Sequence, residues 1–201
     1  MYPFIYLASQ SPRRSQLLTQ LGVKHELLLA GPEEDAEALE EHLAGESPST
    51  YVQRVTRLKL VAALQRLQAR GLPTAPVLCA DTTVALGETI YAKPTDAQDA
   101  QRMLRALSGQ THAVMTAVAL GIGAGQGAQL LQACSESSVT FAALSDAEIS
   151  AYVSSGEPMG KAGAYAVQGL AAAFISRISG SYTGIMGLPL FETAQLLKRL
   201  A

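Results

Sequence analysis

A group of cations stands at the start of a predicted helix, in the segment LASQSPRRSQLLTQLG. Ser11 and Pro12 predict the helix start, because serine caps helices and proline suits the first helical position. Arg13 and Arg14 then add two positive charges to the first turn, where the helix dipole is already positive and each charge costs about 0.3–1 kcal/mol. Free N–H groups, two guanidinium groups and the Ser9 and Ser11 hydroxyls together suit an anion with several oxygens, such as a di- or triphosphate.

These cations, and two lysines farther along the chain, can also be explained without a binding site. On that view Arg13 and Arg14 point to solvent, or pair with the acidic stretch at 33–41. Lys59 lies in the apolar stripe of a predicted helix, where a lysine either extends to the rim of the core or serves a site. Lys93 precedes a proline in AKPTD, and a lysine in a loop commonly does no more than increase solubility.

A carboxylate follows a predicted buried strand. The segment CADTTV places Asp81 at the end of the apolar run 76–81, where ligands gather in open α/β sheets. There a carboxylate either acts as a general base, holds a metal ion or caps a turn. Phosphoryl chemistry uses cations on the phosphate oxygens, a divalent metal and a carboxylate that orients water, so Asp81 and the cations suit it together. The sequence contains no GxxxxGK[ST] motif, which excludes a P-loop enzyme.

Two further features resemble catalytic or binding motifs but are better explained as structure. Cys79 lies in the apolar run VLCAD and is interpreted as an inert core residue. The three histidines are scattered, so none is assigned as the base of a serine or cysteine hydrolase. The glycines of GIGAGQG at 121–127 precede a strand-like segment rather than a helix, which predicts a hairpin loop and not a dinucleotide-binding turn.

Strands and helices alternate along the chain, and these elements must position the candidate residues. The predicted strands cover 4–8, 25–31, 76–81 with 82–86, 89–92 and the runs on either side of 121–127. The predicted helices cover 12–21, 49–70, 97–107, 145–156 and the C-terminal segment after Pro189. The acidic stretch at 32–47 is expected to be a loop or a short exposed helix. This alternation predicts the α/β class, and without a repeat or linker we expect one domain over 1–201.

The composition limits the class of protein. Apolar residues make up 48% of the chain and charged residues 16%, so it can bury a core and is not disordered. The formal net charge of −2 argues against binding to nucleic acid or to a membrane through a broad basic surface, so any anion site must be a local cluster. Two distant cysteines suggest neither a disulfide framework nor a zinc site. The apolar start lacks a basic leader and is too short to span a bilayer, so we expect a soluble cytoplasmic protein.

Five segments occur in order from Leu7 to about Leu190: LASQSPRRSQLLTQLG, ADTTV, AKPTDAQDAQRMLRALSGQTHAVMTAVAL, KAGAYAVQG and SYTGIMGLPL. Together they resemble the Maf family of nucleoside triphosphate pyrophosphatases over nearly the whole chain. The resemblance implies a mixed, twisted sheet in two lobes with substrate in the central cleft, related in shape to the inosine triphosphate pyrophosphatases. It also implies hydrolysis between the α and β phosphates and a divalent cation, Mg²⁺ or alternatively Mn²⁺.

The resemblance further implies roles for individual residues. The implied catalytic residues are Asp81 as proton acceptor, Lys59, Lys93 and Glu34. The implied substrate-binding residues are Ser9, Arg13, Arg14, Thr82 and Gln168. Asp81 and Glu34 are the candidate metal ligands, and a homodimer is implied by the family alone.

The base preference is implied by a short segment near the C-terminal part of the chain. Gln168 in AYAVQG resembles the branch that hydrolyses dTTP and UTP, whereas the branch acting on 7-methyl-GTP differs here. Two residues depart from the pattern of the first branch: Gly160 stands where aspartate is frequent, and Ala166 where glycine is frequent. Neither change removes an implied catalytic group.

Two other functions remain as alternatives. One is a regulatory protein that senses nucleotides in the control of cell division and needs no catalysis. The other is a pyrophosphatase for a different nucleotide, such as 7-methyl-GTP or another modified one. A turnover assay separates these alternatives, because a sensor binds nucleotide without releasing pyrophosphate.

Overall fold

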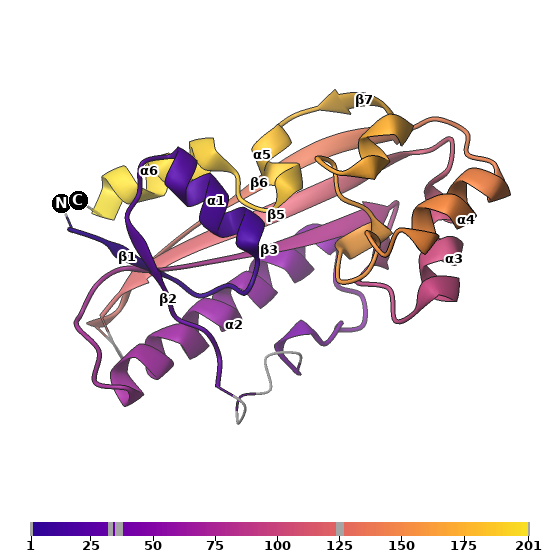
Figure 1. Ribbon diagram of the computed structural model, residues 1–201. Coiled ribbons are helices and arrows are strands. Elements are labelled where there is room, and N and C mark those ends of the chain that lie inside the picture. Colours follow the sequence, from indigo (N-terminus) through magenta and orange to yellow (C-terminus); the bar gives the residue numbers. More distant parts are fainter. Residues whose placement is uncertain (1, 32–33, 35–37, 124–126, 201) are drawn as a thin grey trace.

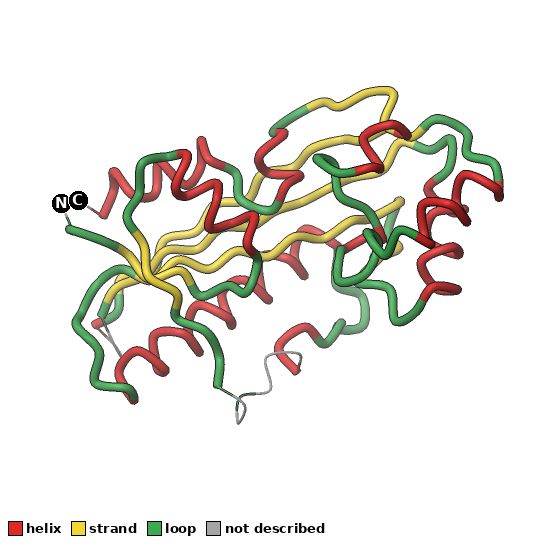
Figure 2. Tube along the Cα trace, in the orientation of Figure 1, coloured by secondary structure: helices red, strands yellow, loops and turns green. Residues whose placement is uncertain are grey.

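The structure is a computed structural model that describes residues 2–31, 34, 38–123 and 127–200 (Figure 1). Over these residues the chain forms a seven-stranded sheet with helices on both faces, as Figure 2 shows. The strands are β1 (Ile5–Leu7), β2 (His25–Leu27), β3 (Val77–Leu86), β4 (Thr89–Tyr91), β5 (Thr111–Ile122), β6 (Gln129–Phe141) and β7 (Ile175–Ser179). The α-helices are α1 (Pro12–Gln20), α2 (Pro48–Ala69), α3 (Ala97–Leu107), α4 (Asp146–Ser154), α5 (Tyr182–Met186) and α6 (Leu190–Leu200), and the 3-10 turns are η1 (Ala38–Glu40), η3 (Ala162–Ala164) and η4 (Leu170–Phe174).

The sheet is mixed, with the order β2-β1-β3-β5-β6-β7, and β4 pairs with the C-terminal end of β3. β1 runs parallel to β2 and β3, whereas β3, β5, β6 and β7 pair antiparallel with their neighbours. The predicted α/β class and mixed sheet are therefore confirmed. β5 and β6 form an antiparallel pair, which confirms that a strand and not a helix follows the glycine-rich segment.

α2 lies against one face of the sheet, and α1, α5 and α6 lie over the other (Figure 1). Successive side chains of a strand point to opposite faces, so the apolar start of β3 is buried on both sides. Cys79 belongs to the core cluster that contains Leu60 of α2, while Leu78 belongs to the cluster that contains Leu17 of α1 and Leu196 of α6. α2 is the longest helix, with 22 residues, yet no helix in the described part of the chain is long and apolar enough to cross a membrane.

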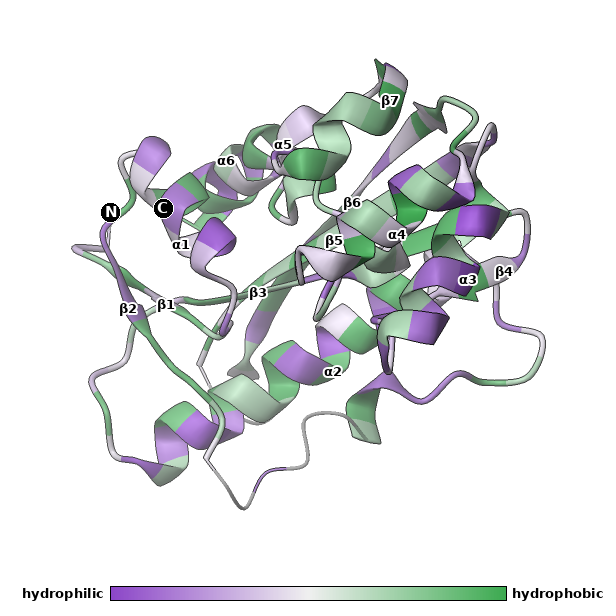
Figure 3. Cartoon of the chain, turned by 45° about the vertical axis from the view of Figure 1, so that its right-hand side comes forward, coloured by the Kyte–Doolittle hydropathy of each residue, from purple (hydrophilic) through white to green (hydrophobic). Residues whose placement is uncertain are grey.

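A second part of the core lies at the far end of the sheet, under α3 and α4. Asp96 caps α3 by accepting a hydrogen bond from the backbone N–H of Asp99, at 2.8 Å, as the sequence predicts. Met103 and Leu104 of α3 then pack with Phe141 of β6 in one buried cluster. Figure 3 shows the outer helices banded green and purple, as expected for helices with one buried and one solvated face.

Strand lengths depend on pairing more than on the apolar pattern. β2 ends at Leu27 although the apolar run continues to 31, because its partner β1 ends at Leu7, which is in register with Leu27. β3 continues without a break through Asp81, so the predicted runs 76–81 and 82–86 form one strand, and the prediction that Asp81 stands at a strand end is wrong. Pairing with β5, where Asp81 lies opposite Ala117, keeps the backbone extended through these polar residues.

The acidic stretch is described in part. Ala38–Glu40 forms η1, and the following residues contain no helix or strand until Ser47 caps α2 by accepting a hydrogen bond from Thr50 N. The predicted helix over 49–70 is thus confirmed almost to the residue. Three of the acids lie outside the described residues: Glu33, Asp35 and Glu37.

One edge of β3 is uncovered over a short central stretch. β1 pairs with β3 only at Val77 and Leu78, because β1 ends at Leu7. On the same edge β4 pairs with β3 only from Val84 onward. Within the described chain, residues 79–83 therefore have β5 as their single neighbouring strand, and their other edge is free.

Candidate active site

A cleft of about 830 Å³ opens along the free edge of β3. Its wall contains residues from the segment after β1, from α2, from β3 and from the loop before α6. Eight of the residues predicted for the site line it: Ser9, Arg13, Arg14, Glu34, Lys59, Asp81, Thr82 and Lys93. Gln168 is exposed and does not belong to the described wall of this cleft.

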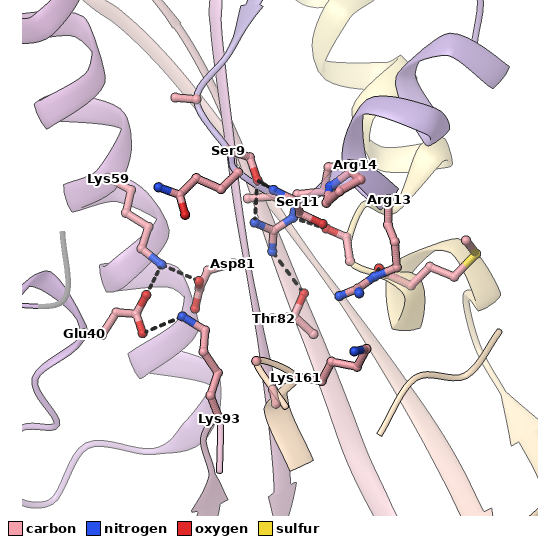
Figure 4. Close-up of a pocket in the computed structure, with 18 of the residues that line it drawn as sticks. Ser9, Ser11, Arg13, Arg14, Glu40, Lys59, Asp81, Thr82, Lys93 and Lys161 are labelled. Carbon is pink, nitrogen blue, oxygen red and sulfur yellow. Dashed lines mark hydrogen bonds and ion pairs between the residues drawn. The ribbon is translucent and has the colours of Figure 1, made fainter. Parts of the chain in front are cut away.

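A network of two acids and two lysines forms one side of the cleft (Figure 4). The Nζ atom of Lys59 lies 2.6 Å from Asp81 Oδ1 and 2.6 Å from Glu40 Oε1. The Nζ atom of Lys93 lies 3.5 Å from Glu40 Oε2. Lys59 reaches this position from α2, where Val55 and Ala63, four residues before and after it, are fully buried. Lys59 therefore serves a polar site at the edge of the core.

The charges of this network stabilise one another. Burial acts to lower the pKa of Lys59, but Asp81 and Glu40 together raise it above its ordinary value. Burial acts to raise the pKa of Glu40, but Lys59 and then Lys93 lower it below its ordinary value. At neutral pH Lys59 is therefore an ammonium group and Glu40 a carboxylate. Lys59 can donate hydrogen bonds here but cannot accept a proton.

Glu40 is a member of the Asp81 network that sequence reasoning missed, while Glu34 lines the cleft outside this network. Glu34 forms an ion pair with Arg66 of α2, whose Nε lies 2.8 Å from Glu34 Oε1. The hydrogen bond from Arg66 is the main reason that the pKa of Glu34 falls to about 2. The structure does not bring Glu34 into contact with the Asp81 network. No signal in the neighbouring sequence distinguishes Glu40 from the other acids of the stretch. Its contact with Lys59 in the folded chain is what identifies it.

Arg14 ties three segments of the chain together. Its guanidinium group donates hydrogen bonds to Gly187 O at 2.8 Å, to Ser9 Oγ at 3.2 Å and to Thr82 Oγ1 at 3.4 Å. Arg13 donates from Nε to Met186 O at 3.2 Å. Among the described residues, neither arginine forms an ion pair, so the proposed pairing with the acidic stretch is not found there.

The burial of the arginines leaves them charged. Burial lowers the pKa of Arg13, and it lowers that of Arg14 as well. A guanidinium group nevertheless stays protonated in proteins. Their partners are neutral oxygens, so their positive charges remain available to an anion in the cleft.

The first turn of α1 is also available to an anion. Ser11 is the N-cap residue, but its side chain makes no capping hydrogen bond. Instead, the N–H of Ser11 donates to Ser9 Oγ at 3.1 Å. Ser11, Pro12 and Arg13 all line the cleft, so this uncapped helix start faces the cleft.

Thr82 is fixed by a chain of hydroxyl groups. Its Oγ1 atom lies 2.9 Å from Thr116 Oγ1, and Thr116 in turn donates to Gly184 O at 2.7 Å. Thr116 lies opposite Thr82 in the β3–β5 register, so the sheet itself brings the two hydroxyl groups together. The same Thr82 oxygen receives Arg14, which links the arginine to the middle of the sheet.

The carboxylates of the network suit a divalent cation that is shared with a ligand. Asp81 Oδ2 has no hydrogen-bond partner among the described residues, so it is free to bind a cation. No group of three metal-ligating side chains occurs in the described chain, but Mg²⁺ is commonly held by one or two carboxylates together with substrate phosphates. Both oxygens of Glu34 accept hydrogen bonds from Arg66, and both oxygens of Glu40 face lysines, so Asp81 is the best placed ligand of the three.

Known proteins resemble this chain over almost its full length. The dTTP/UTP pyrophosphatase of Albidiferax ferrireducens is 67% identical over 198 residues, which cover 98% of this chain and 97% of that protein. The dTTP/UTP pyrophosphatase of a Polaromonas species is 63% identical over 195 residues, with 97% and 95% covered. A solved structure from Mycobacterium abscessus, described as a nucleoside-triphosphatase and dITP/XTP pyrophosphatase, is 18% identical to this chain. The match covers 67% of this chain and 73% of that one with a TM-score of 0.37, and we draw no conclusion from this similarity.

The family of this chain is shown by its match to a family sequence model. The model of the Maf family, described as Maf-like protein, matches residues 4–200. These residues include the arginine-bearing start of α1, the Asp81 network and the loop before α6. The chain therefore belongs to the Maf family.

Proposed function

We propose that this protein hydrolyses dTTP and UTP to the nucleoside monophosphate and pyrophosphate, and thereby clears these nucleotides from the cytoplasmic pool. The observation that carries the proposal is the carboxylate of Asp81, held at 2.6 Å by Lys59 in a cleft that also holds Arg13 and Arg14. A carboxylate beside several cations is the arrangement that water attack on a phosphoanhydride needs.

Asp81 acts on the water molecule in the proposed reaction. Its carboxylate orients water toward the α-phosphorus and accepts a proton as the new P–O bond forms. The bond from the α-phosphorus to the α–β bridging oxygen breaks, and pyrophosphate leaves with its electron pair. Lys59 remains protonated through these steps, because two carboxylates stabilise its charge, and it holds Asp81 in place.

The other residues bind the phosphates. The guanidinium groups of Arg13 and Arg14 and the start of α1 provide hydrogen-bond donors to phosphate oxygens. Lys93, with 55% of its side chain exposed, extends from the opposite wall and can reach a bound phosphate. Asp81 would hold Mg²⁺ together with the substrate phosphates, and the cation when bound would neutralise charge on the phosphates.

The choice of dTTP and UTP rests on the relatives. Both named relatives carry this activity in their names and exceed 60% identity with this chain. Arg13 and Thr82 both line the cleft, which supports a role for them in contacting the substrate. The proposed part of Gln168 in base selection rests on sequence, because its exposed side chain lies outside the described wall of the cleft.

The proposal is tested by turnover. The purified protein is incubated with Mg²⁺ and dTTP, UTP, CTP, GTP or 7-methyl-GTP, and released pyrophosphate is measured. Selective release from dTTP and UTP is expected. Release from another base would contradict the substrate assignment while supporting the chemistry. Nucleotide binding without any release would contradict the enzyme and support the sensor.

A further inference from the structure

Lys161 is a cation of the cleft to which no role has been given. It follows α4 at the end of a turn and lies on the wall of the cleft together with Met159 and Ala162. Its ammonium group donates hydrogen bonds to the backbone oxygens of Glu157 and of Met159, the latter at 3.4 Å. Figure 4 shows its side chain near that of Arg13, across the cleft from Lys59.

The charge of Lys161 is not compensated in the way that the charge of Lys59 is. Lys59 and Lys93 have carboxylate partners within 4.0 Å, whereas the hydrogen-bond partners of Lys161 in the described chain are backbone oxygens. Burial lowers the pKa of Lys161, the nearby charge of Arg13 lowers it further, and the carboxylate of Glu157 opposes this only in part. Two cations that repel each other in a partly buried position do not stabilise the empty protein.

The cleft is therefore divided into two electrostatic regions. One region contains Lys59 and Lys93 together with the acids Asp81 and Glu40, so its charges are balanced. The other contains three cations that lie against neutral oxygens in the described structure: Arg13, Arg14 and Lys161. A polyanion is attracted to the second region and is repelled by the acids of the first.

A nucleoside triphosphate carries its negative charge unevenly, and this distribution matches the two electrostatic regions of the cleft. Of its roughly four negative charges, about three belong to the β and γ phosphates and about one to the α-phosphate. The β and γ phosphates thus suit the three cations that form no ion pair in the described structure. The α-phosphate then falls beside Asp81, where the proposed water attack takes place.

We propose that Lys161 is a further substrate-binding residue, which together with Arg13 and Arg14 holds the β and γ phosphates and the pyrophosphate that they become. This inference rests on the proposed function, because it assigns an orientation to the same substrate. When the α–β bond breaks, negative charge grows on the leaving β-phosphate, and the ammonium group of Lys161 stabilises that charge. Lys161 thus acts on the leaving group, whereas Asp81 acts on the attacking water.

The test compares inhibition by the two products in Lys161→Gln. The inhibition constant for pyrophosphate is expected to rise about tenfold, because a charged hydrogen bond of this kind is lost. The inhibition constant for dTMP is expected to stay within about twofold, because its phosphate is the α-phosphate. Lys161→Arg should restore pyrophosphate binding, and Lys198→Gln, on the exposed surface of α6, is the matched control.

Two results would overturn the inference. One is an unchanged inhibition constant for pyrophosphate in Lys161→Gln while the wild-type protein turns over dTTP, which would leave Lys161 the structural role of bonding its own turn. The other is an equal loss for pyrophosphate and dTMP, because Lys161 would then not distinguish the two ends. If the wild-type protein hydrolyses nothing, the proposed function fails, yet direct calorimetry of pyrophosphate binding still decides for or against Lys161.

Discussion

Asp81 and Lys59 form the central contact of the site, and their roles differ because their surroundings differ. Asp81 has one oxygen on Lys59 and another without a partner in the described chain, so it can still accept a proton or a cation. Lys59 is enclosed by two carboxylates and keeps its proton. In the proposed mechanism, the chemistry at the scale of single residues depends on Asp81, and Lys59 holds it in position.

Replacement of Asp81 by asparagine tests the proton acceptor. Asp81→Asn should lower the rate of pyrophosphate release by about 10²–10⁴-fold, because an amide cannot take up a proton from water. Nucleotide binding, measured by calorimetry, should remain. Asp146→Asn is the control, because Asp146 is an exposed acid paired with Arg105 in α3. Wild-type turnover in Asp81→Asn would contradict the assignment.

The two arginines should separate binding from stability. Arg13→Ala should raise the Michaelis constant for dTTP about tenfold with little change in the unfolding temperature, because Arg13 has one hydrogen bond within the described part of the chain. Arg14→Ala should raise the Michaelis constant and also destabilise the fold by about 1–3 kcal/mol, because Arg14 joins three segments.

Kinetics and thermal unfolding of both arginine variants provide the measurement. Arg102→Ala is the control, because Arg102 is an exposed arginine that pairs with Asp99 within α3. Unchanged Michaelis constants in both cleft variants would show that phosphate is bound elsewhere. An equally stable Arg14→Ala would show that its three hydrogen bonds do not hold the segments together.

At the scale of elements, a short buried contact joins β5 to η3 beside the cleft. His112 of β5 lies 2.8 Å through Nε2 from the hydroxyl group of Tyr165, which follows η3 and lines the cleft. Both rings also pack against Phe141 of β6, edge to face. His112 Nδ1 is buried without a partner in the described structure, and burial lowers the pKa of His112 to about 4.

The shifted histidine predicts a pH-dependent free energy of unfolding. Above pH 6.5 the imidazole is neutral in both the folded and the unfolded state. Between pH 6.5 and about 4 the unfolded state binds a proton that the folded state does not, so the free energy of unfolding falls as the pH falls. The decrease in the free energy of unfolding that His112 causes should approach about 3 kcal/mol near pH 4.

Denaturant unfolding at pH 7 and pH 4.5 checks this contribution. His112→Gln, whose amide can still reach Tyr165, should lose less stability between the two pH values than the wild-type protein does. His42→Asn is the control, because the side chain of His42 is exposed. An equal loss in His112→Gln and in the wild-type protein would place the acid sensitivity elsewhere.

At the scale of the whole molecule, a cationic cleft exists in a chain with a formal net charge of −2. Attraction of the substrate therefore depends on a local field and not on the overall charge. The specificity constant for dTTP should fall about three- to tenfold between 50 and 300 mM salt, because salt screens the field around the cleft. The turnover number should change little, since the interactions within the bound complex are partly buried and screened less.

Steady-state kinetics over this range of salt concentration give the measurement. Arg13→Ala should show a weaker dependence on salt, because one of the cleft charges is gone. Lys198→Gln removes an equal charge from the surface of α6 and should behave like the wild-type protein. A dependence of equal size in all three proteins would mean that the cleft charges do not attract the substrate.

The elements that the sequence predicts well are those with strong local signals. α3 was predicted from its Asp96 cap and apolar face, and α2 from its apolar stripe. The β5–β6 hairpin followed from glycines between two strand-like runs. β2 was predicted too long, and the runs 76–81 and 82–86 were not recognised as one strand, because strand length depends on a partner strand that local sequence does not reveal.

For the site, the sequence by itself determined the residue types and the segments that carry them. The motifs around Arg13, Lys59 and Asp81 identify cations and a carboxylate suited to phosphate, and the structure brings all three into one cleft. Only the tertiary structure decided which acid completes the Asp81 network and that Lys161 lies in the same cleft. These choices rest on contacts between segments far apart in sequence, and many residues of the same type satisfy the local pattern equally well.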